Sequence, residues 1–284
     1  MDLMLIHSAW GFTDSFSTGL PAFKAMGYEG VEVNWIRPNA ERKADLRRSL
    51  DATGLRLIPQ CFTCAWDQGR SVDEHIASFK AQVEDALTWN PLMINFHSGS
   101  DAWTTAEMIA FYRACREIER DVSVPILHET HRGRCFFSPW STREVLREVP
   151  DLQFTADFSH WVCVAERLID DQLPIIHQVA ERTRHIHARV GFRGGPQVPD
   201  PRDPVYAEEL AAHERWWDLC WASMVTRGLN RVTLMPEFGP FPYLHHAPFS
   251  NQPVADIREI NQWQGARQRD RFRQQYGARS VGPQ

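Results

Sequence analysis

Strand-like and helix-like segments alternate eight times along the 284 residues of this chain. Two helices are clearest, because apolar residues recur there at the three-to-four residue step of an amphipathic helix, over 72–87 and over 108–118. Further helices are expected at 16–26, 40–53, 140–148, 168–182, 213–227 and 254–275. The strands are expected at 3–10, 28–35, 55–62, 91–98, 124–131, 152–159, 184–190 and 231–238.

This alternation predicts an α/β protein with a closed (β/α)₈ barrel, a TIM barrel, as a single domain over residues 1–284. Parallel strands joined by right-handed crossovers leave no exposed sheet edge when the sheet closes on itself. A doubly wound open sheet is the alternative, but it calls for a glycine-rich phosphate turn after the first strand, and Trp10-Gly11-Phe12-Thr13 is not one. The stretch 191–212 is expected to form a loop over the active face, and 254–275 a C-terminal helix.

Composition and charge exclude several classes of protein. The chain is 43% hydrophobic and 24% charged, without a basic leader or an apolar run of the ~20 residues that a membrane span needs. We therefore expect a cytoplasmic protein without a membrane partner. A net charge of −5 offers no general source of affinity for nucleic acid. The six cysteines are scattered and expected to be reduced, and Cys61 and Cys64 lack the second pair that a four-sulfur zinc site requires.

Polar residues interrupt the strands near their carboxyl ends, where a buried parallel strand is otherwise apolar. They alternate with apolar residues, so that one face of each strand is polar and must point into the barrel. The polar positions are Glu32 and Asn34, Asn95 and His97, Glu129 and His131, Thr155 and Asp157, His185, His187 and Arg189, and Glu237. All converge on the end of a TIM barrel where active sites form.

Three of these side chains, Glu129, Asp157 and Glu237, would repel one another in a shared lumen unless a cation lies among them. Together with His187 they form an oxygen-rich ligand set suited to Mn²⁺, Mg²⁺, Co²⁺ or Zn²⁺. The sequence thus predicts one divalent metal ion. The alternative is that the carboxylates form structural ion pairs with Arg132, Arg134, Arg189 or Arg193.

Four short motifs resemble the xylose-isomerase-like superfamily, which includes sugar isomerases, ketose 3-epimerases, inosose dehydratases and apurinic endonucleases of the endonuclease IV type. They are His128-Glu129-Thr130, Asp157-Phe158-Ser159-His160, His185-Ile186-His187 and Pro236-Glu237-Phe238-Gly239. The resemblance implies that Glu129 and Glu237 are both metal ligands and the acid/base pair that moves a proton beside a carbonyl. It also implies that His160 and Arg193 contact substrate.

The apurinic endonucleases also carry a histidine motif like Asn95-Phe96-His97-Ser98-Gly99-Ser100. Their trinuclear zinc site needs further histidines where this chain has Gln60 and Pro199-Asp200-Pro201-Arg202, so three metals are not expected. His97 is instead expected to hydrogen-bond substrate or a ligand, with a buried, hydrogen-bonded structural histidine as the alternative.

Aromatic and basic residues near the strand ends suggest the substrate. Trp10 and Trp161 are expected to cover the apolar face of a sugar, with rim packing as the alternative, and Arg189 and Glu32 to contact substrate. Arginines over the same face are compatible with a carboxylate or phosphate on the substrate. Trp216, Trp217 and Trp221 follow a helical step typical of a core or of an interface, which leaves a homo-oligomer open.

The leading hypothesis is therefore an isomerase or epimerase acting on a keto-sugar or its acid. A metal-dependent lyase or dehydratase acting on an inosose or oxidised glycoside would use the same proton abstraction. An apurinic endonuclease is less consistent with the charge, and a sugar-binding barrel without catalysis is the remaining alternative.

Overall fold

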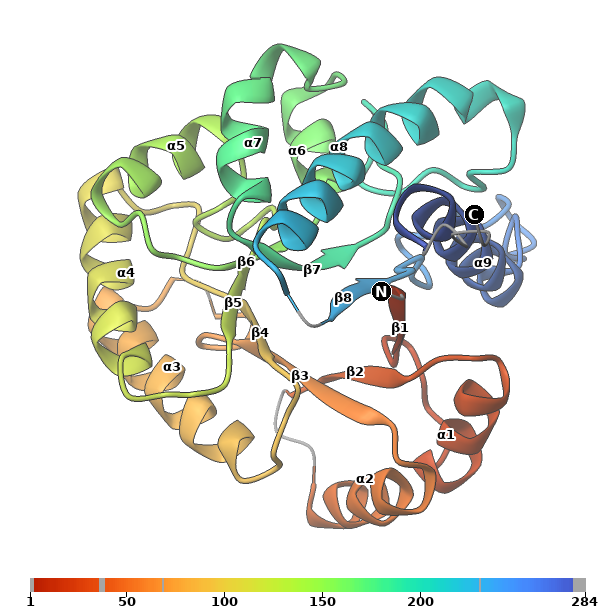
Figure 1. Cartoon of the computed structure of the whole chain (residues 1–284), viewed down its shortest axis with the longest axis horizontal. Coiled ribbons are helices and arrows are strands. Elements are labelled where there is room, and N and C mark those ends of the chain that lie inside the picture. Colours follow the sequence, from red (N-terminus) through yellow and green to blue (C-terminus); the bar gives the residue numbers. More distant parts are fainter. Residues whose placement is uncertain (1–2, 36–38, 68, 230, 278–284) are drawn as a thin grey trace, which may run out of the picture.

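The computed structural model describes residues 3–35, 39–67, 69–229 and 231–277. Its eight parallel strands form one closed barrel, in which each strand pairs with the next and the last pairs with the first (Figure 1). The predicted TIM barrel and each of the eight predicted strands are confirmed. The strands are β1 (Leu3–Ser8), β2 (Gly30–Asn34), β3 (Arg56–Phe62), β4 (Ile94–His97), β5 (Ile126–Glu129), β6 (Phe154–Ala156), β7 (Thr183–His187) and β8 (Val232–Met235).

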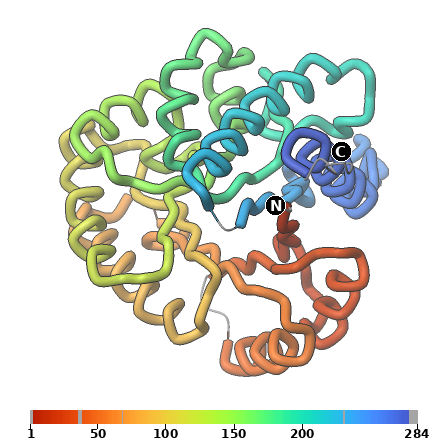
Figure 2. Tube along the Cα trace, viewed as in Figure 1, coloured from red at the N-terminus to blue at the C-terminus, as the bar shows by residue number. Residues whose placement is uncertain are grey.

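Helices surround the barrel as an outer ring, as the trace in Figure 2 also shows. Local signals set several of their ends: Ser71 and Glu74 form a capping box that starts one helix, and Gly54 takes the left-handed conformation that ends another. The helices are α1 (Phe16–Ala25), α2 (Ala40–Thr53), α3 (Val72–Leu87), α4 (Thr105–Glu119), α5 (Pro139–Glu148), α6 (Phe158–Ala165), α7 (Leu173–Ala180), α8 (Ala207–Thr226) and α9 (Ile257–Tyr276).

Helix α6 was not expected from the sequence, which instead favoured a strand running to residue 159. The run Phe158-Ser-His-Trp-Val-Cys-Val-Ala is rich in β-formers and, being largely buried, shows no polar face. The strand stops earlier because Asp157 caps the helix, its Oδ1 accepting a hydrogen bond of 3.0 Å from the backbone N–H of Ser159. A predicted metal ligand thus also starts a helix.

The loop after β7 is shorter than the predicted 191–212, because α8 begins at Ala207 after a turn of 3₁₀ helix at Pro204–Tyr206. Asp203 starts that turn by accepting a hydrogen bond of 3.0 Å from Val205 N–H. The C-terminal helix is confirmed as α9, which packs beside β1. No helix among the described residues is long and apolar enough to cross a membrane.

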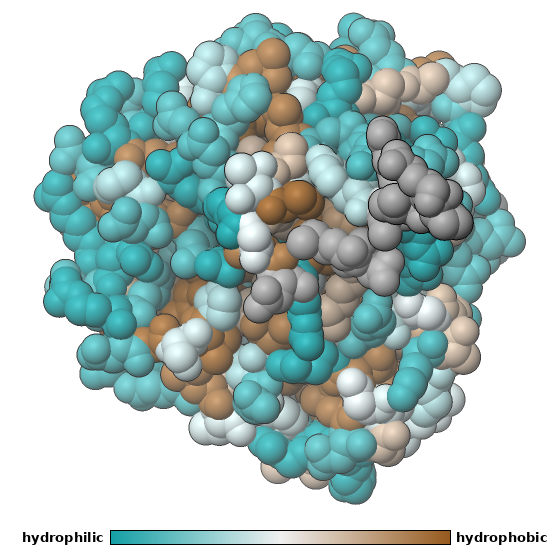
Figure 3. Space-filling view, viewed as in Figure 1, coloured by the Kyte–Doolittle hydropathy of each residue, from teal (hydrophilic) through white to brown (hydrophobic). Residues whose placement is uncertain are grey.

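The apolar interior has two parts. The larger one lies between the strands and the helices and contains Trp216, Trp217 and Trp221, all wholly buried within the chain, which makes them core residues and not an interface. The smaller one fills the floor of the barrel with Met4, Ile6, Ile58, Met93, Leu127 and Met235. The outer face in Figure 3 is mostly hydrophilic, with scattered apolar residues. Some polar residues also reach the level of the apolar floor, since Thr233 is in register with Met4.

Candidate metal centre and active site

The four predicted metal ligands lie directly above the apolar floor. Strand alternation puts Glu129 two residues after Leu127, and Glu237 two residues after Met235, on the inward-facing side. Asp157 and His187 reach the same level from the ends of β6 and β7. Each of the four offers one ligand atom, and these atoms all lie within 4.8 Å of one another. The structure thus brings together residues that are more than a hundred positions apart in the sequence.

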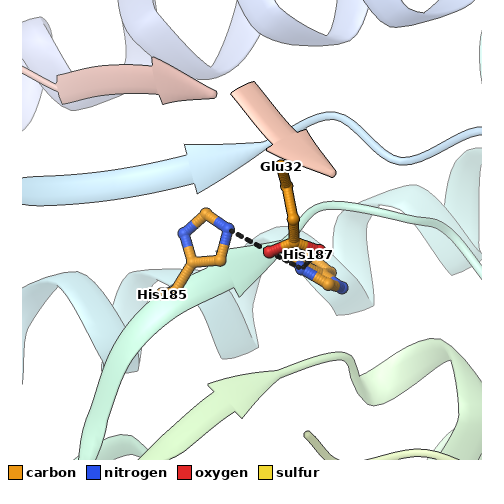
Figure 4. Close-up of side chains that lie close together, drawn as sticks. All are labelled: Glu32, His185 and His187. Carbon is orange, nitrogen blue, oxygen red and sulfur yellow. Dashed lines mark hydrogen bonds and ion pairs between the residues drawn. The ribbon is translucent and has the colours of Figure 1, made fainter. Parts of the chain in front are cut away.

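His187 is the centre of this cluster. Its Nδ1 lies 2.9 Å from Glu237 Oε2 and 3.5 Å from Glu129 Oε1. Its Nε2 lies 3.2 Å from Glu32 Oε1 on the other side of the ring, and Glu32 also lies 3.7 Å from His185 Nε2 (Figure 4). A carboxylate behind a histidine in this way fixes the orientation and tautomer of the ring. Glu32 therefore directs Nδ1 of His187 toward the other carboxylates.

Arg189 lies in the same cluster and is almost wholly buried. Its guanidinium forms ion pairs with Asp157 and, at 3.3 Å, with Glu237. The structural ion pairing that the sequence left as an alternative is thus present for these two carboxylates. Burial disfavours the charged guanidinium, but the two carboxylates raise the pKa of Arg189 above its ordinary value. The group is permanently charged.

The cluster has the charge and the donor atoms that a divalent cation requires. Glu129, Asp157 and Glu237 carry three negative charges when ionised, and the guanidinium of Arg189 compensates one of them. Two negative charges remain. Glu129 Oε1, Glu237 Oε2 and His187 Nδ1 are buried without a hydrogen-bond partner, although they lie close together. Buried polar atoms of this kind normally have partners. Carboxylate oxygens with one imidazole suit a hard to borderline divalent ion, so the residues fit one.

The ionisation of the carboxylates reflects their burial. Burial raises the pKa of Asp157 above its ordinary value, and the neighbouring Glu237 and Glu129 add to this. Burial also acts to raise the pKa of Glu129, but His97 and His187 hold it well below the usual range. Burial raises the pKa of Glu32 to about 7, although His187 opposes the shift. Of these three carboxylates, Glu129 is thus the one held most firmly in its ionised form.

Three histidines line the mouth beside the cluster. His97 Nε2 lies 2.9 Å from Glu129 Oε2 and 3.2 Å from Gln60 Nε2. The ring of His131 lies between the other two, with centroid distances of 4.2 Å to His97 and 3.8 Å to His160. Burial lowers the pKa values of His131 and His160 well below the usual range. His131 was not among the predicted site residues, although its alternation with Glu129 placed it on the inward face.

Two aromatic residues cover Arg189 at the mouth. Trp10, predicted to contact substrate, is half-buried, and its ring centroid lies 4.7 Å from that of Tyr243. The centroids of these rings lie 5.7 Å and 4.9 Å from Arg189 Cζ, respectively. A Cβ atom at Gly239 would lie 2.0 Å from the Trp10 ring, so a glycine is needed for this packing. Tyr243 was missed because it lies in the irregular segment after β8, where no motif marks it.

Two residues predicted to contact substrate lie away from the four-residue cluster. Trp161, predicted to cover a sugar face with rim packing as the alternative, is wholly buried in the main core, and its indole N–H donates a hydrogen bond of 2.9 Å to the backbone oxygen of Phe136. Its position on the unexpected helix α6 explains this burial. Arg193 is exposed at the tip of a turn in which Phe192 and Gly195 form an isolated bridge. The structure gives Arg193 no contact with the four-residue cluster among the described residues.

Trp161→Phe is expected to lower the free energy of unfolding by about 1–3 kcal/mol, because the buried carbonyl of Phe136 loses its donor. Urea denaturation measures the loss, and a titration with Mn²⁺ is expected to give the same affinity as the wild type. If Trp161→Phe left the free energy of unfolding unchanged but altered the affinity for a ligand, Trp161 would act in the binding site and not in the core.

The eight strands form a closed barrel, and buried carboxylates and an imidazole lie at the carboxyl ends of these strands. This arrangement defines a TIM-barrel protein whose polar centre lies at the end where active sites form. The chain belongs to the xylose isomerase-like TIM barrel family, whose profile matches residues 20–195. This confirms the family that the motifs indicated. A search of curated proteins gives no significant match.

Solved structures share the fold at low sequence identity. D-allulose 3-epimerase from Methylomonas sp., in complex with D-allulose, aligns with a TM-score of 0.61 and 12% identity over 94% of this chain and 97% of that one. A probable 3-DHS dehydratase from Bacillus anthracis gives 0.58 and 16% over 92% and 97%. An L-ribulose 3-epimerase gives 0.59 and 12% over 99% and 100%. The fold therefore serves both epimerases and a probable dehydratase.

Proposed function

We propose that this protein is a metal-dependent isomerase or epimerase that acts on a keto-sugar or sugar acid. The observation that carries the proposal is the convergence of Glu129, Asp157, His187 and Glu237 within one coordination sphere at the mouth of the barrel. These four residues would hold one divalent ion, Mn²⁺, Mg²⁺, Co²⁺ or Zn²⁺. Such an ion polarises a carbonyl and stabilises the negative charge that develops on its oxygen when the neighbouring carbon loses a proton. The partner is a small polyol.

The residues of the chain supply the proton transfers and the binding. Glu129 removes the proton from the carbon beside the carbonyl. Glu237, from a different strand, returns a proton to the same carbon in an epimerisation or to the former carbonyl carbon in an isomerisation. His97 and His160 donate hydrogen bonds to substrate hydroxyls, and Trp10 covers the apolar face of the sugar. Arg189 compensates part of the negative charge of Asp157 and Glu237 through its ion pairs. Arg193, which lies on an exposed turn, contacts the substrate.

Removal of the metal tests the proposal first. We expect isothermal titration of chelator-treated protein with Mn²⁺ to give one ion per chain and the Asp157→Asn protein to bind it much more weakly, because a ligand charge is lost. Asp170→Asn, an exposed position paired with Arg215, serves as the matched control and is expected to bind like the wild type. Wild-type protein that binds no divalent ion would refute the proposed centre.

The reaction is tested by incubating the metal-loaded protein with keto-sugars and sugar acids in D₂O. An isomerase or epimerase is expected to incorporate deuterium beside the carbonyl and to give a product that otherwise has the mass of the substrate, as NMR and mass spectrometry would show. A lyase acting on an inosose or oxidised glycoside, the second candidate, would expel water or another leaving group. Loss of mass would therefore select the lyase over the isomerase.

A further inference from the structure

The loop after β5 carries two arginines that have no carboxylate within ion-pair distance among the described residues. Within the part of the chain that the structure describes, the buried Arg134 donates only to backbone oxygens, those of Thr63, Gly99 and Ala65. The half-buried side chain of Arg132 has one polar contact with these described residues, from Nη1 to Cys163 Sγ at 3.7 Å. Sulfur is a weak acceptor, so most of the five donors of this guanidinium are available to a ligand.

Arg132 lies at the mouth of the barrel beside the candidate active site. Its Cζ is 5.2 Å from the ring centroid of Tyr243, the same ring that lies 4.9 Å from Arg189 Cζ. The neighbouring His131 and His160 have adjacent rings. A polyol lying over the partly exposed ring of His131 would thus have one end near the carboxylate cluster and the other near Arg132.

The charges of the site leave these arginines without compensation. The three carboxylates of the cluster are balanced by Arg189 together with a divalent ion. Glu32 adds at most one negative charge, and it faces His187 and His185 instead of the β5 loop. Among these described groups, at least one arginine therefore remains without a carboxylate partner at the mouth. Because the guanidinium of Arg132 is only half-buried, an anion can reach it and form charge-assisted hydrogen bonds with it.

We propose that Arg132 binds an anionic group, a carboxylate or a phosphate, at the end of the substrate remote from the reacting carbon. A guanidinium matches either group with two parallel hydrogen bonds. Tyr243 packs against the guanidinium and limits its rotation. The inference rests on the proposed function and narrows its substrate to sugar acids or sugar phosphates.

Three six-carbon polyols that differ only at C1 test this: D-glucitol, D-gluconate and D-glucitol 1-phosphate. Their dissociation constants are measured by calorimetry on Mn²⁺-saturated protein. We expect one or both anionic ligands to bind at least about tenfold more tightly than D-glucitol, with the preference falling as NaCl rises. The anionic ligand that binds more tightly relative to D-glucitol shows whether the site prefers a carboxylate or a phosphate. Arg132→Gln is expected to remove most of that preference, and Arg132→Lys to retain part of it.

Arg215→Gln is the matched control, because it removes an arginine that is exposed and already paired with Asp170. Equal affinities for the three ligands in wild-type protein, or a preference that survives in Arg132→Gln, would overturn the inference, since a carboxylate bound to the metal alone would not need Arg132. If Arg132→Gln fails to fold, the salt dependence of the wild type and the Arg132→Lys affinities decide. Turnover of a neutral keto-sugar without any preference for anions would leave the proposed function standing and this inference refuted.

Discussion

Glu237→Gln is expected to lower kcat by about 10²–10⁴-fold while the protein still folds. The amide keeps the shape of the side chain and one oxygen, but it does not take up a proton at neutral pH. Arg189 loses one ion-pair partner at 3.3 Å and keeps its contact with Asp157. The measurement is turnover of the keto-sugar accepted by the wild type, together with circular dichroism of both proteins.

The interpretation of this variant depends on whether it still binds metal, because Glu237 is expected to be both a ligand and a proton carrier. A Mn²⁺ titration separates the two roles: retained metal with lost turnover identifies the proton transfer. Glu208→Gln, on the exposed side of α8, is the control and is expected to be fully active. An active, metal-replete Glu237→Gln enzyme would exclude Glu237 from the acid/base pair.

Arg189→Met is expected to destabilise the chelator-treated protein by about 3–5 kcal/mol, because it leaves buried carboxylates without their compensating charge. The same change is expected to raise the affinity for a divalent ion, since the cation no longer shares Asp157 and Glu237 with a guanidinium. Saturating Mn²⁺ should therefore restore more stability to the variant than to the wild type. Urea denaturation with chelator and with Mn²⁺ measures both effects.

Arg215→Met provides the comparison, because its ion pair with Asp170 is exposed and such pairs contribute only about 0–1 kcal/mol. A loss of stability for Arg189→Met no larger than that of the control would show that Arg189 does not compensate the cluster. A decrease in metal affinity would instead mean that Arg189 holds the ligands in position more than it competes for them.

The positions of the site residues were predictable where they depended on strand alternation. Glu129 and Glu237 follow Leu127 and Met235 by two residues, so their inward direction could be inferred without coordinates. The motif Asp157-x-x-His160 was also recognisable, although the sequence did not indicate that Asp157 caps a helix. A buried helix shows no amphipathic pattern, and the run of β-formers after Asp157 therefore favoured a longer strand.

The burial of Trp161 and the role of Tyr243 could not be inferred in the same way. Trp161 lies in the core because it is part of helix α6, which the sequence did not predict. Tyr243 reaches the mouth from an irregular segment whose path depends on its packing against Trp10. Neither position follows from a period in the sequence, since irregular segments and buried helices have no repeating pattern to read.

The sequence by itself determined the barrel, its eight strands and the end at which polar side chains gather, because hydrophobic alternation and helical periodicity are local properties of the chain. Only the tertiary structure decided the partners within that end: Glu32 lies behind His187, Arg189 lies between Asp157 and Glu237, and Arg132 packs on Tyr243. Those contacts join different strands and loops. Their energies depend on distances across the closed barrel, which no single stretch of sequence encodes.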